Sequence, residues 1–229
     1  MAINKNSNGF TIGFAIVLVV VVGTILATIS MGLSDLQKKN QNDKKRINIL
    51  SAIGVEANRD NAAALFETYV KTSELISGKD KATANAFDVD IKKEFRDQSI
   101  ALEDRNYPLY TCEKDGKTYY VIPMVGKGLW GPVWGFVSLE DDKTTIYGAI
   151  FDHKAETPGL GAEIKTPPFQ DQYKGEKISS KIIVTKKGDG AGINSKVDAI
   201  TGGTITSVGV EEMVYRTLEV YKTYFATQN

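Results

Sequence analysis

A run of apolar residues near the N-terminus constrains this chain more than any other feature. Residues 10–29 contain no charged side chain, and the nearest charges are Lys5 before the run and Asp35 after it. A helix of about 20 residues is roughly 30 Å long, the thickness of the hydrocarbon core of a bilayer. A cleaved signal peptide is the alternative, but its apolar region is usually shorter, and Thr28-Ile29-Ser30 matches an Ala-x-Ala cleavage site only weakly. We therefore expect a tail at residues 1–9 and a retained single-pass helix at residues 10–31.

The composition of the remaining chain excludes several kinds of chemistry. The 229 residues carry 28 basic and 28 acidic side chains, so no charge excess favours nucleic acid as a partner. Cys112 and His153 are the only residues of their kinds. One cysteine cannot form a disulfide within the chain or hold an iron–sulfur cluster alone, and one histidine leaves no ordinary zinc site and little support for a hydrolytic triad. We expect no metal and no catalytic side chain, so redox activity would require an organic cofactor.

Polar residues and then helical patterns follow the apolar run. We expect a tether at residues 32–46, a short helix that ends at Gly54, and an amphipathic helix at residues 61–77. The expected inner face of the amphipathic helix is formed by Ala64, Leu65, Tyr69, Leu75 and Ile76. The charged segment at residues 78–105 has no clear pattern. Its apolar side chains are expected to attach it to the core: Phe87, Val89, Ile91 and Phe95.

Strand patterns begin near Tyr107. Residues 109–113 and 117–122 flank Lys114-Asp115-Gly116, a tight-hairpin signature, and residues 133–139 and 144–151 flank a second short turn. A further strand is expected at residues 178–186, before the glycine-rich loop at residues 188–192. Adjacent hairpins with helices at both ends predict the α+β class, with one mainly antiparallel sheet, flanking helices and a single domain at residues 47–229.

A glycine turn followed by the last helix is the most unusual feature of the C-terminal part. Asp198-Ala-Ile-Thr-Gly-Gly-Thr-Ile-Thr-Ser207 places two glycines between two threonines. The helix is expected to start near Ser207 with Glu211 and Glu212 in its first turn, and its positive dipole end would suit a phosphate. No lysine follows the glycines, so this is not the phosphate loop of nucleoside triphosphatases. A simple capped glycine turn stays open as the alternative. The apolar stripe of this helix consists of Val210, Val214, Leu218, Tyr221 and Phe225.

Two further stretches are candidates for the same site. Residues 126–135 contain four glycines and two tryptophans, which indicates either backbone packed against a flat ring or partner, or a β-bulge beside core tryptophans. Glu156-Thr-Pro-Gly-Leu-Gly161 is either an ordinary turn or part of a binding loop. His153 lies three residues before Glu156 and is expected to be a hydrogen-bonded structural residue.

These three stretches together resemble the FMN-binding domain family. Residues 198–204 resemble its flavinylation motif, Asp-x-x-Ser/Thr-Gly-Ala-Thr, with Thr201 in place of the commoner Ser and Gly203 where Ala is usual. The Gly-x-Gly-x-Trp-x-x-x-x-Gly and Glu-Thr-Pro-Gly-Leu-Gly elements of the family are matched at residues 126–135 and 156–161. The resemblance implies that Thr204 carries FMN through a phosphoester bond. The cofactor-binding residues expected on this basis are Thr204, Thr201, Gly202, Gly203, Asp198, Trp130, Glu156, Thr157, Leu160 and Gly161.

The segment after the apolar run narrows the resemblance. The Asn-Ile-Leu-x-Ala-x-Gly run at residues 48–54 resembles one branch of the family, the C subunits of the Na⁺-translocating NADH:quinone oxidoreductases. This implies a flavoprotein that relays single electrons among the other subunits of a membrane complex, without independent catalytic activity. It also implies a separate transferase that attaches FMN from FAD. The alternatives are the paralogous flavin subunit of the ferredoxin–NAD⁺ electron-transport complex, and a membrane-anchored binding domain without a redox role.

The orientation of the anchor is a point of conflict. The basic cluster at residues 38–46 follows the apolar run, whereas only Lys5 precedes it, so a charge count places the large domain in the cytoplasm. The family resemblance implies the opposite, a bacterial inner-membrane protein with its large domain on the periplasmic side. We adopt the second expectation, because the charge rule weakens when a long folded domain must cross. The expected partners are the other subunits, the flavin transferase and membrane lipid.

Overall fold

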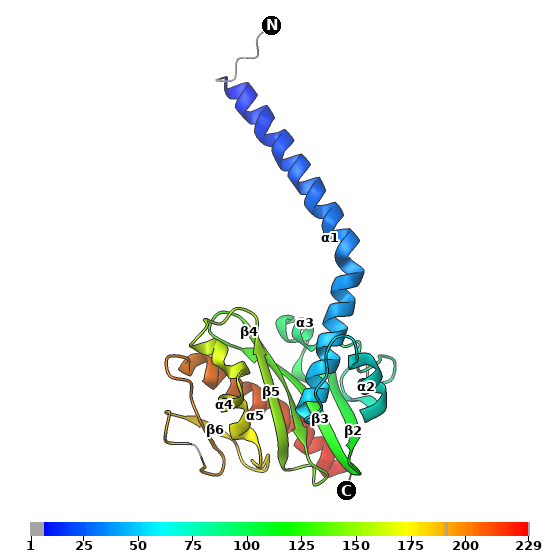
Figure 1. Cartoon of the computed structure of the whole chain (residues 1–229), viewed down its shortest axis with the longest axis vertical. Helices are drawn as coiled ribbons and strands as arrows, with labels where there is room; N and C mark the ends of the chain where they lie inside the picture. The colour runs from blue at the N-terminus through cyan, green and yellow to red at the C-terminus, as the bar shows by residue number, and fades with distance from the viewer. Residues whose placement is uncertain (1–6, 191, 229) are drawn as a thin grey trace. The chain divides into compact units, whose positions relative to one another are not determined.

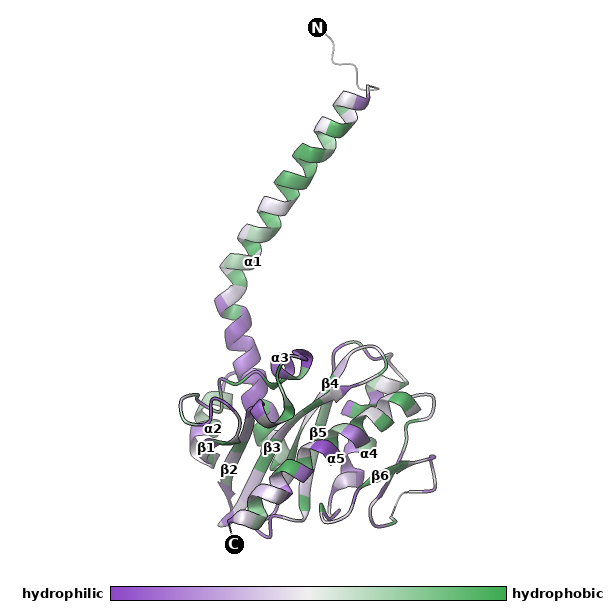
Figure 2. Ribbon diagram, turned by 180° about the vertical axis from the view of Figure 1, so that it is seen from behind, coloured by the Kyte–Doolittle hydropathy of each residue, from purple (hydrophilic) through white to green (hydrophobic). Residues whose placement is uncertain are grey.

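The computed structural model describes residues 7–190 and 192–228, and its first element is a long helix. Helix α1 runs from Asn8 to Ala52 without interruption, and among the described residues it is the helix long and apolar enough to cross a membrane. Figure 2 shows a long apolar stretch in its N-terminal part, followed by a hydrophilic stretch. Positions 1–6 of the expected tail lie outside the described residues, whereas Asn8 is already helical. The chain divides into two compact units, one ending at Lys44 and one beginning at Lys45.

Helix α1 ends inside the second unit in the way its sequence predicts. Gly54 has a φ of +67°, the left-handed conformation that glycine adopts without strain. The Val55 N–H donates to the Leu50 carbonyl and the Gly54 N–H to the Ser51 carbonyl, at 3.0 Å each. This pair of bonds is a Schellman motif, so the last carbonyls of the helix are satisfied.

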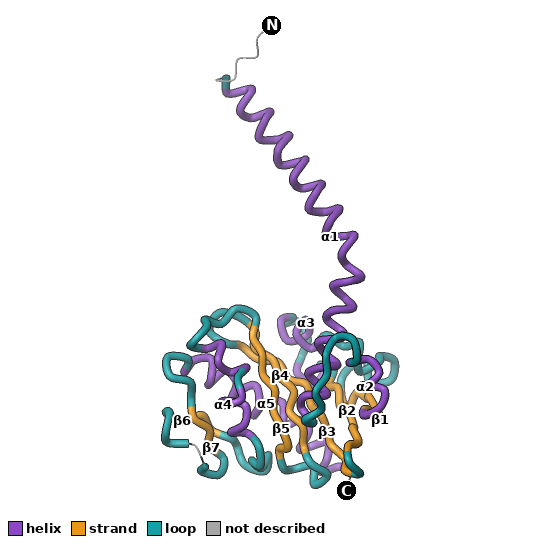
Figure 3. The backbone as a smooth tube through the Cα atoms, viewed as in Figure 1, coloured by secondary structure: helices purple, strands orange, loops and turns teal. Residues whose placement is uncertain are grey.

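A five-stranded antiparallel sheet forms the centre of the second unit, in the spatial order β1-β2-β3-β4-β5 (Figures 1 and 3). Consecutive strands are neighbours and antiparallel; short loops join β2 to β3, β3 to β4 and β4 to β5, whereas residues 78–106 separate β1 from β2. The α+β fold with a mainly antiparallel sheet is therefore confirmed. The strands are β1 (Val70–Ser77), β2 (Tyr107–Lys114), β3 (Lys117–Lys127), β4 (Pro132–Leu139) and β5 (Ile146–His153).

Each face of the sheet is covered by a different helix, as Figures 1 and 2 show from opposite sides. Helix α5 (Thr204–Thr227) covers one face, where its stripe packs on side chains such as Ile122 and Met124. The end of α1 covers the other face, where Leu50 packs with Tyr110. Alternate residues of β2 and β3 enter the two cores, as the period of a strand requires. The predicted stripe of α5 is buried throughout: Val210, Val214, Leu218, Tyr221 and Phe225.

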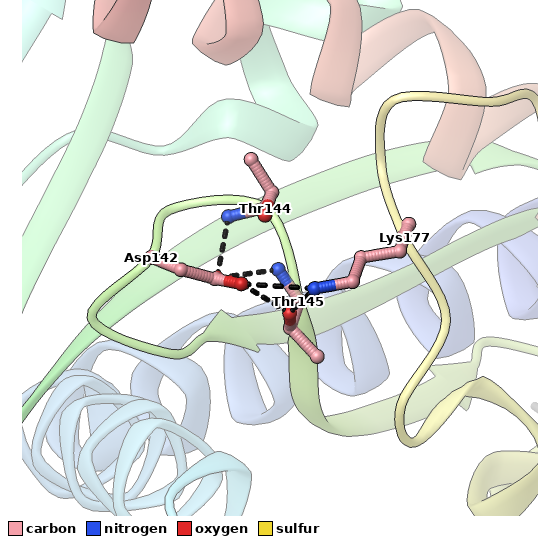
Figure 4. A network of polar contacts seen from close by, with 4 residues as sticks. All are labelled: Asp142, Thr144, Thr145 and Lys177. Carbon is pink, nitrogen blue, oxygen red and sulfur yellow. Dashed lines mark hydrogen bonds and ion pairs between the residues drawn. The ribbon is translucent and has the colours of Figure 1, made fainter.

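Two tight turns fix the register of the sheet. Asp115 and Gly116 have φ values of 52° and 74°, as a two-residue hairpin turn between Lys114 and Lys117 requires, so the predicted hairpin is confirmed. In the turn between β4 and β5, Asp142 accepts the backbone N–H groups of the two following threonines, at 2.9 Å and 2.7 Å (Figure 4). Lys177 donates to the same carboxylate at 3.0 Å, which attaches the segment before β6 to this turn.

The expected helix at residues 61–77 is wrong in its second half. Helix α2 covers only Ala62–Tyr69, and Val70–Ser77 is the edge strand β1. This segment is a strand because it pairs with β2. The β-branched residues Val70 and Thr72 at its start also suit a strand. Leu75 and Ile76 are both buried, as the expected inner face of the helix also required. In the strand, a register shift between Leu75 and Ser77 accompanies the burial of these two consecutive residues.

Short elements connect the sheet to α5, and two further expectations are corrected here. The strand expected at residues 178–186 is only β6 (Ile183–Thr185), which pairs in parallel with β7 (Lys196–Asp198) in a separate small sheet. Helix α5 begins at Thr204, not near Ser207, with Gly203 as its N-cap, so the expected acidic first turn is also wrong: Glu211 and Glu212 lie further along the helix. The remaining elements are α3 (Ile91–Arg96), α4 (Pro167–Gln170) and the 3₁₀ turns Leu102–Asp104, Gly161–Lys165 and Asp171–Tyr173.

Candidate functional site

A pocket of about 260 Å³ lies where three loops meet the N-terminus of α5. One loop joins β3 to β4, one follows β5, and the third is the glycine turn before α5. The three stretches that the sequence singled out therefore come together in space, although they lie far apart along the chain. The residues lining the pocket are Leu129, Trp130, Glu156, Thr157, Leu160, Gly161, Gly202, Gly203, Thr204, Ile205 and Thr206.

Glu156 holds the three segments together. Its side chain is buried; Oε1 accepts the backbone N–H of Trp130 at 2.8 Å and Oε2 accepts the hydroxyl of Thr206 at 2.7 Å. Its own backbone N–H donates to Nδ1 of His153 at 3.1 Å. The bond to Thr206 keeps the carboxylate beside the first turn of α5, where the helix dipole favours a negative charge. Both carboxylate oxygens are thus engaged by the protein, and Glu156 positions the pocket walls.

Glycine is required around this carboxylate because the chain segments approach closely. A Cβ atom at Gly161 would lie 2.5 Å from Oγ1 of Thr206 and 2.6 Å from Oε2 of Glu156. Gly202 has a φ of +73°, and a Cβ atom there would lie 2.6 Å from Cδ2 of Leu160. A larger residue at either position would push the glycine turn away from the loop after β5.

The first turn of α5 presents backbone donors to the pocket. Gly203 is the N-cap and contributes no side-chain cap, so the N–H groups at the start of the helix have no intrahelical acceptor. Ser207 stabilises the turn from inside: its Oγ accepts the Ile200 N–H at 3.1 Å and donates to the Gly203 carbonyl at 3.0 Å. Thr204 occupies the first helical position with an exposed side chain. Among the described residues, its hydroxyl makes no hydrogen bond.

The rim of the pocket is apolar and exposed. Trp130 is 65% exposed and Ile205 62% exposed. Single exposed apolar side chains are common, but several gathered around one pocket indicate a ligand or partner site. The alternative of two core tryptophans is therefore wrong for Trp130. Trp134 is half-buried on β4, where the Nζ of Lys92 lies 3.2 Å from the centroid of its ring. The other exposed apolar residues near the pocket are Leu129, Leu160 and Val208.

His153 contributes to the loop after β5 and not to the pocket lining. Because its Nδ1 accepts the Glu156 N–H, the neutral ring carries its proton on Nε2, which is buried and has no partner among the described residues. This supports the structural role expected for it.

Two predicted residues lie outside the pocket lining. Asp198, at the end of β7, accepts the Gly190 N–H at 2.7 Å and holds the glycine-rich loop. Thr201 is exposed at the corner of the turn. Conversely, Leu129, Ile205 and Thr206 line the pocket but were not predicted from the sequence. Of these three, only Thr206 has a side-chain donor, which makes the bond to Glu156.

Comparisons with known proteins relate this chain to one family and one fold. A model of the FMN-binding domain family matches residues 128–219. Over 92% of its length the chain is 32% identical to the C subunit of the Na(+)-translocating NADH-quinone reductase of Vibrio alginolyticus, and covers 90% of that protein. The crystal structure of the C subunit from Parabacteroides distasonis superposes with a TM-score of 0.76 at 38% identity, covering 86% of this chain and 98% of that one. Shewanella oneidensis NqrC, 24% identical, shares the fold with a TM-score of 0.68, and 82% and 97% of the two chains are covered.

The match to the Vibrio protein extends over nearly the whole of both chains, and the family model covers all three loops that line the pocket. The family resemblance inferred from the three motifs is therefore confirmed, and this chain belongs to the family of Na⁺-translocating NADH-quinone reductase C subunits.

Proposed function

We propose that this chain is the flavoprotein subunit of a Na⁺-translocating NADH-quinone reductase, and that FMN joined to Thr204 by a phosphoester relays single electrons through it. The observation that carries the proposal is the position of Thr204, an exposed hydroxyl at the first turn of α5 inside a pocket built from all three family motifs. Bound FMN supplies one-electron transfer, which no side chain of this pocket can perform.

The residues present fit a flavin phosphate. Uncapped N–H groups at the start of α5 provide donors, and the positive end of the helix dipole favours an anionic group. The hydroxyl of Thr204 is not used by the described part of the chain and is open to a transferase. Threonine is a weak nucleophile without a base. The buried carboxylate of Glu156 is already engaged by Trp130 and Thr206, so we propose a separate transferase that donates FMN from FAD.

The apolar rim fits a flat ring. Trp130, Leu160 and Ile205 would contact it, and the backbone of Thr157 and Gly161 would lie at its edge. A volume of about 260 Å³ is below the range of roughly 300–1,000 Å³ that encloses most cofactors. The ring would therefore stay partly exposed, which suits a relay that must approach donors and acceptors on other subunits. We propose supporting roles for Gly202, Gly203, Asp198 and Thr201 in shaping the turn.

The proposal also places the chain in the inner membrane. We propose residues 10–31 of α1 as a single-pass anchor, residues 32–46 as its helical extension, and residues 47–229 as an FMN-binding domain on the periplasmic side. Relatives that match over nine-tenths of the chain favour this assignment over the paralogous ferredoxin-linked subunit. Protease digestion of intact spheroplasts tests the orientation: a domain protected until the membrane is permeabilised would contradict the periplasmic side.

The decisive experiment follows the flavin through denaturation. Protein from its native host is run on a denaturing gel and examined for flavin fluorescence, and its mass is measured intact and by peptide mapping. The expected result is one added FMN on the peptide that contains Thr204. Thr204→Ala should lose the fluorescent band, whereas Thr223→Ala, which removes an exposed threonine from the same helix, should keep it. A bare Thr204 peptide from the native host would refute the flavoprotein proposal and favour an anchored domain without a redox role.

A further inference from the structure

A second, smaller pocket lies away from the flavin pocket and shares no lining residue with it. It is formed by α3, the start of β2, the end of β3 and the middle of α5, and its volume is about 40 Å³. Two arginines from segments far apart in the sequence line it: Arg105, just before β2, and Arg216, on α5. A tyrosine, Tyr107, lines the same cavity.

The two guanidinium groups share one aromatic ring. The Cζ of Arg105 lies 5.7 Å and that of Arg216 4.8 Å from the centroid of Phe95 on α3. Arg216 donates to the Val125 carbonyl at 2.6 Å, while the Nε of Arg105 is buried and has no hydrogen-bond partner among the described residues. Among the side chains that the structure describes, no carboxylate oxygen lies within 4.0 Å of either guanidinium. Two like charges are thus held together without a counter-ion from this part of the chain.

The one acidic residue that lines the described pocket is already engaged elsewhere. The carboxylate of Glu94 accepts two hydrogen bonds from Asn106, one from its backbone N–H at 2.8 Å and one from its side-chain Nδ2 at 2.6 Å. Burial, and then the charge of Arg105, lower the pKa of Arg216, and the smaller opposing effects of Tyr107 and Glu212 do not offset them. Counting Arg105, Arg216 and Glu94, the lining carries a net charge of +1.

We propose that this pocket binds a small oxyanion, a phosphate or carboxylate group, through the guanidinium groups of Arg105 and Arg216. Arg105 and Arg216 lie on one ring, and no described carboxylate oxygen is within 4.0 Å of either. The planar guanidinium fork of each matches an oxyanion in two-point geometry. The volume leaves space for one small group only. The anion is therefore either a free ion or the headgroup phosphate of a lipid whose remainder stays outside.

The test is calorimetric titration of the full chain, solubilised in a neutral detergent, with inorganic phosphate against sodium chloride of equal ionic strength. We expect binding of phosphate, weakened about tenfold or more in Arg105→Gln and Arg216→Gln, because each removes charge-assisted hydrogen bonds. Lys93→Gln removes a charge from α3 outside the pocket and should bind as the unmodified chain does. The Arg105 side chain makes no hydrogen bond to the described residues, so its variant should fold; far-UV circular dichroism checks this.

The outcomes separate the proposal from its alternatives. No phosphate binding, or equal binding in the Arg105→Gln variant, would overturn it; the second result would assign the response to another site, such as the start of α5. Repeating the titration in nanodiscs separates the two sources. Phosphate binding that is lost in nanodiscs of phosphatidylglycerol and phosphatidylcholine, but present in the neutral detergent, identifies a lipid headgroup as the occupant. Equal binding in nanodiscs and detergent identifies a soluble anion.

Discussion

Removing the hydroxyl of Thr206 should destabilise the second unit more than its small size suggests. Thr206→Val conserves shape but deletes the donor that satisfies Oε2 of the buried Glu156 at 2.7 Å. A hydrogen bond to a charged group contributes about 1.5–3 kcal/mol, and the carboxylate oxygen left behind is buried. We expect the free energy of unfolding to fall by about 2 kcal/mol, which for a domain of this size lowers the Tm by about 4–8 °C.

The assay is urea and thermal unfolding of the solubilised chain, followed by circular dichroism. Thr223→Val is the matched control: it removes a hydroxyl that donates to the Glu219 carbonyl on the exposed side of the same helix, and should change stability by no more than about 0.5 kcal/mol. A double-mutant cycle with Glu156→Gln then isolates the pair, with an expected coupling of about 1 kcal/mol or more. The reasoning fails if Thr206→Val costs no more than Thr223→Val, or if the two substitutions are additive.

Three further predictions concern other parts of the fold. Gly202→Ala should cost more stability than Gly188→Ala, because both have positive φ but only the first places a Cβ atom against Leu160; equal unfolding midpoints would contradict this. Burial lowers the pKa of Lys45 from 10.5 to about 8, so the folded state binds fewer protons than the unfolded state between those values. The free energy of unfolding of the chain should then rise by up to about 3 kcal/mol from pH 8 to pH 10.5. A Lys45→Met variant should lack this rise in urea titrations. Burial raises the pKa of Cys112 to about 12, so N-ethylmaleimide at pH 8 should label it only after unfolding, and rapid labelling of native protein would refute its placement.

The sequence predicted those parts of the fold that local chemistry determines. Asp115 and Gly116 adopt the positive φ values that a tight hairpin requires, and no tertiary contact is needed to see this in the sequence. The stripe of α5 repeats at helical spacing and is buried along its whole length. The three motifs were also expected in one site, but this came from the family resemblance, because no local rule brings residue 130 to residue 204.

The sequence failed where tertiary pairing decided between two local possibilities. Residues 70–77 have apolar positions compatible with a helix, and only the open edge of β2 makes them a strand. Serine is a better cap than glycine by propensity, so the sequence predicts the start of α5 near Ser207, three residues after its position in the structure. In the structure, Ser207 uses its hydroxyl to close the turn at Ile200 instead. Gly203 is then the residue before the helix, and Thr204 is exposed at the first helical position.

The arrangement of the pocket gives a physical reason for a covalent link of the proposed kind. An apolar rim with Trp130 and Ile205 largely exposed buries only part of a flavin ring, so non-covalent contacts alone would hold it weakly. Enclosing the ring would strengthen binding but would also increase its distance from redox partners on other subunits. A phosphoester at Thr204 removes this conflict, because retention no longer depends on burial. Glu156 then has a separate structural role, because by fixing Trp130 and Thr206 it keeps the open pocket in one shape, whether or not a ring lies in it.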